Sequence, residues 1–150
     1  MKIRAQTSTA LRALLDLCLH TAPQSPASLN EIGSRQGLSV AFLEQLFRRL
    51  KSAALVAPWR GMKGGYTLAR PADQVSLWEV LRALEDPLVK PVAAEKGGAP
   101  EEQVLRQCFA RLEGKWEEDL KGLSLADLRD EARGNPALAG VPREGVGFEI

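Results

Sequence analysis

The sequence predicts a mainly α-helical fold with one small β-hairpin and a long amphipathic helix near its C-terminus. Three observations predict this class. Apolar residues recur at helical spacing in several segments, which are separated by breaks rich in Gly, Pro and Ser. Two short apolar runs flank the glycine-rich segment 60–65, as in a hairpin. From residue 101 onward, apolar residues recur every four positions over about five helical turns.

The 150 residues are enough for one domain with a core, or for a small domain with an oligomerisation arm. The net charge of +1 hides an uneven distribution. Residues 1–70 hold ten Lys and Arg against three acids, whereas residues 71–150 hold ten against sixteen. A basic half suits a polyanionic partner, and an acidic half does not, so we expect the two halves to have different tasks.

The N-terminal part predicts three helices, of which the second and third are joined by a short turn. Residues 9–20 place apolar side chains on one face of the first helix. Ser28 and Glu31 have the spacing of a capping box that opens the next helix. Gly37 ends that helix, and Ser39 is the expected N-cap of a further one. Two helices joined by a short turn containing Gly are typical of a helix-turn-helix.

The second helix of this pair, residues 40–53, is amphipathic, with an apolar stripe and a polar, basic opposite face. An ordinary surface helix would also be charged, but residues 48–52 contain no acid and a hairpin follows directly. We therefore expect this helix to enter the DNA major groove. Its residues expected to face DNA are Ser39, Ala41, Glu44, Gln45, Arg48 and Arg49.

The following hairpin resembles the wing of a winged helix-turn-helix. Strands are expected at 55–57 and 66–68, and the glycines between them allow a tight turn. Arg60 and Lys63 in that turn would reach the flanking DNA backbone. The segment lacks the spacing and the Lys-Ser/Thr ending of a phosphate-binding loop. Residues 1–86 are thus expected to form a winged helix-turn-helix DNA-binding domain.

The C-terminal part is expected to hold an oligomerisation arm. A capping box at Ser76 opens a helix to about Asp86, a flexible loop spans 87–100, and 101–133 form the long helix and a short closing helix. Residues 134–150 are expected to be a loosely ordered tail. The long helix needs a cover, which a second copy could supply, although packing within a monomer is the alternative. Its expected dimerisation residues are Val104, Leu105, Phe109, Leu112, Trp116 and Leu120.

Other classes are disfavoured by what the sequence lacks. Two cysteines do not make a disulfide framework, and the N-terminus resembles neither a signal peptide nor a membrane span, so we expect a cytoplasmic protein. One histidine, with no paired carboxylates on a recognisable loop and no nucleophile elbow, argues against an enzyme.

Roughly the first 85 residues resemble the iron–sulfur-cluster regulator (IscR-like, NsrR-like) family of bacterial winged helix-turn-helix transcription regulators. The resemblance rests on ALRALLDLCLH, LNEIGSRQGLSVAFLEQLFRRLKSAALV, RGMKGGYTLARP and VSLWEVLRALE, in that order and spacing. It implies a homodimer held by the long helix on a palindromic operator. It also implies that Glu44 and Gln45 contact bases and that Arg60 reaches the minor groove, roles that suit their chemistry. A phosphate contact suits Ser39, and electrostatic contacts suit Arg48 and Lys63.

Two departures from the family pattern bear on function. Phe42 stands where relatives often carry Tyr, which removes a hydroxyl contact to phosphate. Residues 87–107 contain no cysteine, so Cys108 alone cannot hold a cluster, which needs about four ligands. Cys18 and His20 fit a core position and a helix end better than metal ligation. We expect a member without a cofactor.

The signal to which such a regulator responds is left open by the sequence. Cys108 is either a redox-reactive thiol or an inert, buried one, and a small molecule or a protein could bind near residues 87–100. The alternative function is a winged-helix protein-interaction module that no longer binds DNA. Its interface would be centred on Trp59 and Met62.

Overall fold

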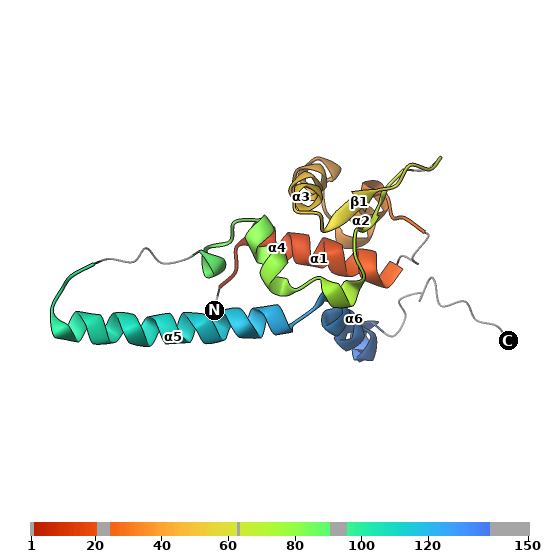
Figure 1. Ribbon diagram of the computed structural model, residues 1–150. Coiled ribbons are helices and arrows are strands. Elements are labelled where there is room, and N and C mark those ends of the chain that lie inside the picture. Colours follow the sequence, from red (N-terminus) through yellow and green to blue (C-terminus); the bar gives the residue numbers. More distant parts are fainter. Residues whose placement is uncertain (1, 21–24, 63, 91–95, 139–150) are drawn as a thin grey trace.

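The computed structural model describes residues 2–20, 25–62, 64–90 and 96–138. They form a mainly helical fold with one antiparallel hairpin, as the sequence predicts (Figure 1). The elements are α1 (Ala5–His20), α2 (Leu29–Gln36), α3 (Val40–Ser52), β1 (Val56–Pro58), β2 (Tyr66–Leu68), α4 (Leu77–Ala83), α5 (Pro100–Gly122) and α6 (Leu125–Gly134). Three short 3-10 helices are η1 (Ala72–Gln74), η2 (Pro87–Val89) and η3 (Pro136–Leu138).

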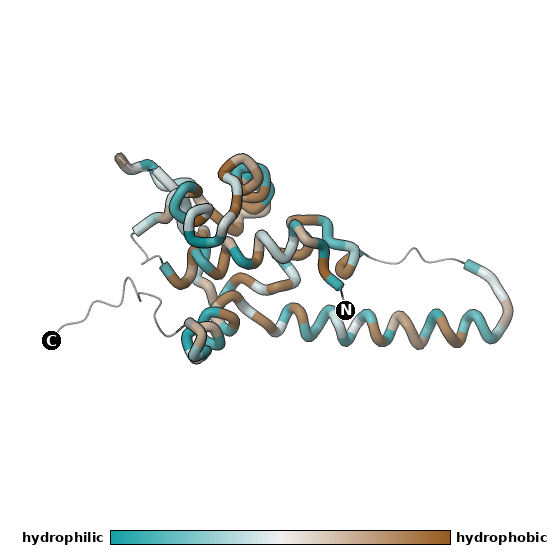
Figure 2. The backbone as a smooth tube through the Cα atoms, turned by 180° about the vertical axis from the view of Figure 1, so that it is seen from behind, coloured by the Kyte–Doolittle hydropathy of each residue, from teal (hydrophilic) through white to brown (hydrophobic). Residues whose placement is uncertain are grey.

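Helix α1 lies at the centre of the core and contacts α2, α3, α4, α6 and β2. Its buried face is built from Ala10, Ala13, Leu14 and Leu17, none of which is exposed. The small alanines allow close approach of the neighbouring helices, and the leucines fill the space between them. In Figures 1 and 2, α3 and the hairpin lie on one side of α1, and α5 and α6 lie on the other.

The turn between α2 and α3 has the geometry that the sequence predicts. The Ser28 hydroxyl accepts a hydrogen bond from the Glu31 amide at 3.1 Å, and the Glu31 carboxylate accepts one from the Ser28 amide at 2.9 Å. Gly37 ends α2 in the left-handed region, with φ of 67°, where a side chain would be strained. Ser39 then caps α3 by accepting from the Phe42 amide. The chain therefore forms a helix-turn-helix.

The hairpin, residues 56–68, pairs Val56 with Leu68 and Pro58 with Tyr66. We call this segment the wing. Tyr66 also pairs with Ala27, the residue before the Ser28 cap, through two backbone hydrogen bonds of 2.8 and 3.1 Å. Gly65 has φ of 113°, and a Cβ there would lie 2.6 Å from the Ala27 carbonyl oxygen, so only glycine fits. The base of the wing is thus fixed to the start of α2.

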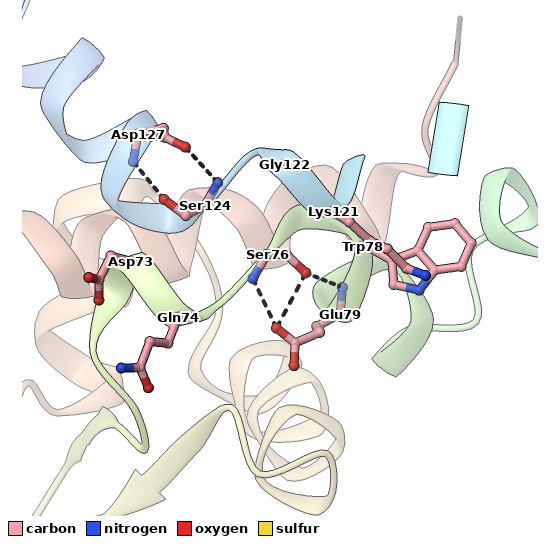
Figure 3. Close-up of a pocket in the computed structure, with 9 residues that line it drawn as sticks. All are labelled: Asp73, Gln74, Ser76, Trp78, Glu79, Lys121, Gly122, Ser124 and Asp127. Carbon is pink, nitrogen blue, oxygen red and sulfur yellow. Dashed lines mark hydrogen bonds between the residues drawn. The ribbon is translucent and has the colours of Figure 1, made fainter. Parts of the chain in front are cut away.

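Helices α4 and α6 begin side by side, each with a capping box. Ser76 and Glu79 form one box, and Ser124 and Asp127 form the other (Figure 3). Backbone hydrogen bonds of 2.8 Å from Leu77 to Leu123 and from Leu125 to Val75 join the two starts. The C-terminal end of α5 is therefore fixed to the domain, whereas its N-terminal part extends away from it (Figure 1).

Three element boundaries differ from the sequence prediction. Helix α1 begins at Ala5 instead of residue 9, because the polar first turn is anchored: the buried Thr7 hydroxyl donates to Asp86 at 2.6 Å. Helix α4 ends at Ala83 instead of Asp86. Glu85 adopts a positive φ of 52°, and Pro87 disfavours a helical Asp86 before it.

The third boundary is the first strand of the wing, which is shifted by one residue to Val56–Pro58. In the loop expected at 87–100, η2 is ordered and residues 91–95 lie outside the described part of the chain. Of the tail expected at 134–150, α6 and η3 cover residues up to 138, and residues 139–150 lie outside the described part of the chain.

Among the described residues, no helix is both long and apolar enough to cross a membrane.

Candidate nucleic-acid interface

The outward face of α3 carries the polar residues singled out in the sequence. Leu43, Leu46, Phe47 and Leu50 are buried and seat the helix on the core. Their burial leaves the opposite face in solvent, where Ser39, Ala41, Glu44, Gln45 and Arg48 are all exposed. These five side chains include a hydroxyl, an amide, a carboxylate and a guanidinium. Such groups can contact base edges and phosphates.

Arg49 has a different environment from Arg48. Its side chain is about one-third exposed and its guanidinium lies 3.7 Å from the carboxylate of Glu85, which follows α4. An ion pair as exposed as this contributes little stability. The pair nevertheless links α3 to the end of α4, so Arg49 is only partly available to an external anion.

The wing carries Arg60 at an exposed position beside two apolar side chains. Trp59 is 39% exposed and Met62 is fully exposed. The Trp59 indole lies over Gly61, where a Cβ would approach its Nε1 atom to 2.5 Å. Lys63, the second cation expected in this turn, lies outside the described residues. The tip therefore presents at least one cation and a large apolar group to solvent.

The contacts at the base of the wing fix its position relative to α3. The Phe47 ring, on the buried face of α3, lies 5.0 Å from the Tyr66 ring of β2, with the two planes inclined at 58°. The Trp59 amide donates to the Gly65 carbonyl at 2.8 Å and closes the hairpin. These contacts hold the wing against α3, and the two elements lie on the same side of α1 (Figure 1).

Asp16 positions the helix-turn-helix, a role that the sequence analysis did not assign. It is 1% exposed, and its carboxylate accepts hydrogen bonds from the Arg35 guanidinium at 2.7 Å and from the Gln36 side-chain amide at 2.8 Å. The Arg12 guanidinium donates to the Gln36 carbonyl at 2.7 Å. These bonds join α1 to the end of α2, just before the turn into α3. The sequence did contain one indication of this role. Asp16 is a carboxylate on an otherwise apolar face of the first helix, and a charge buried there requires partners.

Helix α5 exposes much of its apolar face in the single chain. Val104, Leu105, Phe109 and Leu112 are each between 54% and 65% exposed, and Figure 2 shows apolar segments recurring along the helix. Trp116 is half-buried. Leu120, expected from the sequence to belong to the same interface, is 7% exposed and is covered by its own chain. Cys108 lies on this helix and is partly exposed.

A helix-turn-helix with an exposed polar second helix, followed by a basic wing, defines the winged helix-turn-helix class of DNA-binding regulators. A family model agrees with this class. Residues 3–131 match the Rrf2 model, described as "Iron-dependent Transcriptional regulator". The chain belongs to the Rrf2 family and is a DNA-binding transcription regulator. The family consists of regulators and not of enzymes.

Individual relatives support this assignment. A candidate HTH-type transcriptional regulator of Synechocystis sp., slr0846, is 36% identical over the whole of both chains. The HTH-type transcriptional regulator IscR of Sodalis glossinidius is 42% identical over 86 residues, 57% of this chain and 52% of that protein.

Solved structures show the same fold. The CymR structure, of the global cysteine regulator of B. subtilis, matches with a TM-score of 0.74 and 30% identity. It covers 87% of this chain and 98% of that one. The T. potens IscR structure matches with a TM-score of 0.70 and 30% identity, over 88% of each chain.

The residues present do not fit the iron centre that the family description implies. Ligation by cysteine requires a thiolate. Burial raises the pKa of Cys18 to about 11, against the opposing charges of Arg129 and Arg133, so this thiol stays protonated. Within the described ranges, no three His, Cys, Asp or Glu side chains come together in a way that could hold a metal ion.

Proposed function

We propose that this chain is a cytoplasmic, homodimeric repressor that binds a palindromic operator and carries no iron–sulfur cluster. The observation that carries this proposal is the exposed face shared by α3 and the wing, with Gln45, Arg48 and Arg60 all in solvent. Family membership supports DNA as the partner. The absence of any cysteine between residues 87 and 107 supports the cluster-free form.

The contacts to DNA divide into reading and anchoring. Gln45 can pair with adenine, and Glu44 can accept a hydrogen bond from the cytosine amino group, so these two would select the sequence. Ser39 and Ala41, at the start of α3, leave room for a phosphate near the N-terminus of the helix. Arg48 and Lys63 would supply charge contacts to the backbone, and Arg60 would enter the minor groove. Arg49 would assist only after leaving Glu85.

A second copy of the chain would bury the exposed apolar face of α5. Four large apolar side chains in a row on one helix are costly in water, and a two-fold axis would cover the same residues on both copies. Val104, Leu105, Phe109 and Leu112 form this surface, with Trp116 at its edge. Two reading surfaces related by that axis would match a palindromic operator.

The signal that controls DNA binding would act on the chain between the winged domain and the middle of α5, that is, near residues 87–108. A small molecule is one candidate. The other is oxidation of Cys108, which is supported by its partial exposure on α5. Loss of an oxidant response in Cys108→Ser would assign the signal to this thiol.

Selection of bound fragments from genomic DNA by the purified protein tests the proposal. We expect a palindromic consensus. In Gln45→Ala, one position in each half-site should lose its preference, because a bidentate contact is worth about 1–3 kcal/mol of discrimination. Arg111→Ala, an exposed arginine on α5, is the control and should select the wild-type consensus. Enrichment of unrelated fragments by the wild-type protein would refute sequence-specific binding.

A second candidate function is a protein-interaction module that uses the wing. The exposure of Trp59 and Met62 favours it, because such groups are common at the centres of interfaces. Under this alternative, the selected fragments would share no consensus and DNA affinity would be only nonspecific at physiological salt.

A further inference from the structure

The tip of the wing carries an apolar side chain that is wholly in solvent. The Gly64 amide donates a hydrogen bond to the Gly61 carbonyl at 3.1 Å, so the loop between β1 and β2 closes in a tight turn. Met62 directly follows the first residue of this turn and is fully exposed. The loop projects away from the rest of the molecule (Figures 1 and 2). Met62 thus belongs to the projecting tip.

Trp59 supports this tip from one side. Its indole lies against Gly61, where an added Cβ would approach the Nε1 atom to 2.5 Å, and its amide donates to the Gly65 carbonyl at 2.8 Å. Gly65 in turn lies against the Ala27 carbonyl, at the base of the wing. A hairpin that is held at its base and at its tip loses little conformational entropy when it binds. The tip is therefore pre-organised to meet a partner.

The charge around the tip favours nucleic acid as that partner. Residues 45–72 contain six Lys and Arg and no acid. Arg60, which follows Trp59 directly, is exposed. A cation beside an apolar side chain suits the DNA minor groove, where the negative potential attracts arginine and apolar side chains enter between base steps.

The surface beside the tip is less suited to an apolar protein partner. A hollow of about 490 Å³ lies between the wing and the start of α2. Apart from Trp59 and Met62, its described lining is small, polar or proline: Ser25, Pro26, Ser28, Glu31, Gly61 and Gly64. The core of a protein interface is more apolar and carries fewer charges than this. The two apolar side chains of the tip are thus isolated, and a narrow groove that accepts one such group fits them better.

We propose that Met62 is an apolar wedge, which enters the minor groove at one flank of each half-site, partly unstacks two base pairs and kinks the duplex. The unbranched Met62 side chain suits a groove about 6 Å wide, whereas the larger Trp59 packs against the deoxyribose at its edge. Unstacking is least costly at TA and CA/TG steps, so the wedge selects a flexible step without a hydrogen bond to its bases. This inference rests on the proposed function, because it requires the wing to lie on an operator.

Operator fragments with 2-aminopurine in place of adenine at the flanking steps test the wedge, because this base fluoresces more strongly when it is unstacked. The wild-type protein should raise the fluorescence at one step in each half-site, and circularly permuted fragments should show a bend there. Met62→Ala should lose both effects, whereas Met62→Leu, which keeps an apolar wedge, should retain them. Because Met62 is fully exposed, both variants should fold as the wild type does, which circular dichroism checks.

A change of the flanking step measures the selectivity. The consensus operator is prepared with TA or with AA at the step that responds. The wild-type protein and Met62→Leu should bind the TA operator about tenfold more tightly, whereas Met62→Ala should bind the two operators about equally.

The outcomes separate the wedge from the proposed function. A wild-type protein that binds its operator, loses a base preference in Gln45→Ala and leaves every 2-aminopurine probe unchanged would overturn the wedge alone. Equal fluorescence responses by Met62→Ala and the wild type would also overturn it. A wild-type protein that selects no operator would refute the proposed function and the wedge together.

Discussion

At the scale of single residues, the two cysteines have opposite environments. Cys18 is buried in α1 and its pKa is raised to about 11 by burial, whereas Cys108 is partly exposed on α5. A thiol reacts as its thiolate, and at pH 8 only about one Cys18 in a thousand would be ionised. The two thiols should therefore react at very different rates.

Titration with a chromogenic disulfide reagent checks this difference. At pH 8 we expect one thiol per native chain to react rapidly, and the second only after unfolding. Cys108→Ser should abolish the rapid phase, whereas Cys18→Ala should leave it unchanged. Because burial raises the pKa of Cys18 in the folded chain, the protonated thiol favours the folded state. This contribution to the free energy of unfolding is fully present below about pH 9 and is lost as the pH rises through about 11. A rapid phase that survives in Cys108→Ser would contradict this assignment.

Asp86 joins the N-terminus of the chain to the end of α4. It is fully buried and accepts hydrogen bonds from the Thr7 hydroxyl, the Leu88 amide and the Arg4 amide. Burial alone would raise its pKa, but the hydrogen bonds, led by that from Thr7, lower the pKa below its ordinary value. The ionised form is therefore favoured in the folded state, and folding gains stability from it.

Replacing Asp86 with Asn should lower the free energy of unfolding by about 1–3 kcal/mol at pH 7, because the buried donors lose their charged acceptor. Since the folded pKa is lowered, this stability is present above about pH 4 and declines as the pH falls through the folded pKa. Urea unfolding at pH 7 and at pH 3 measures both effects. A difference between the two proteins that is the same at both pH values would argue against an ionised Asp86.

At the scale of elements, helix α5 is the element whose apolar face is least covered within a single chain. Leu105 lies in its exposed apolar face at 57% exposure, and a charge there would be buried in a dimer. Leu105→Asp should therefore convert a dimer into a monomer at about micromolar concentration and weaken operator binding, with the fold of the winged domain unchanged.

Sedimentation and circular dichroism together test this prediction. Gln107→Asp places the same charge on another exposed position of α5 and should remain dimeric. A wild-type protein that sediments as a monomer would exclude this helix as a dimer interface.

The sequence predicted the elements whose signals are local. The capping boxes predicted at Ser28 and Ser76 are hydrogen bonds between residues three apart in the sequence, and each one marks the start of its helix correctly. The first turn of α1 was missed because its support comes from Asp86, which is 79 residues away from Thr7. No local pattern contains such a contact.

The same distinction holds at the site. Periodicity predicted which side of α3 faces outward, because the buried stripe fixes the opposite face. It could not separate Arg48 from Arg49, since the partner of Arg49 is Glu85, far along the chain. Asp16 was likewise missed as a positioning residue, because its partners come from α2.

At the scale of the whole molecule, the basic and the acidic residues are concentrated in different parts of the chain. Residues 1–70 carry a net charge of +7 and residues 71–150 a net charge of −6. Helix α3 and the wing belong to the basic part and lie on one side of α1, opposite α5 and α6 (Figure 1). A duplex would thus be attracted to one side of each chain and repelled from the other.

The salt dependence of operator binding tests this account most directly. The logarithm of the binding constant should fall linearly with the logarithm of salt concentration, with a slope of several units. Arg48→Ala and Arg60→Ala should each weaken binding about tenfold or more and reduce the slope by about two per dimer, while the chain stays folded. Arg111→Ala should change neither quantity. A slope near zero, or unchanged affinity in both Arg48→Ala and Arg60→Ala, would contradict the placement of DNA against α3 and the wing.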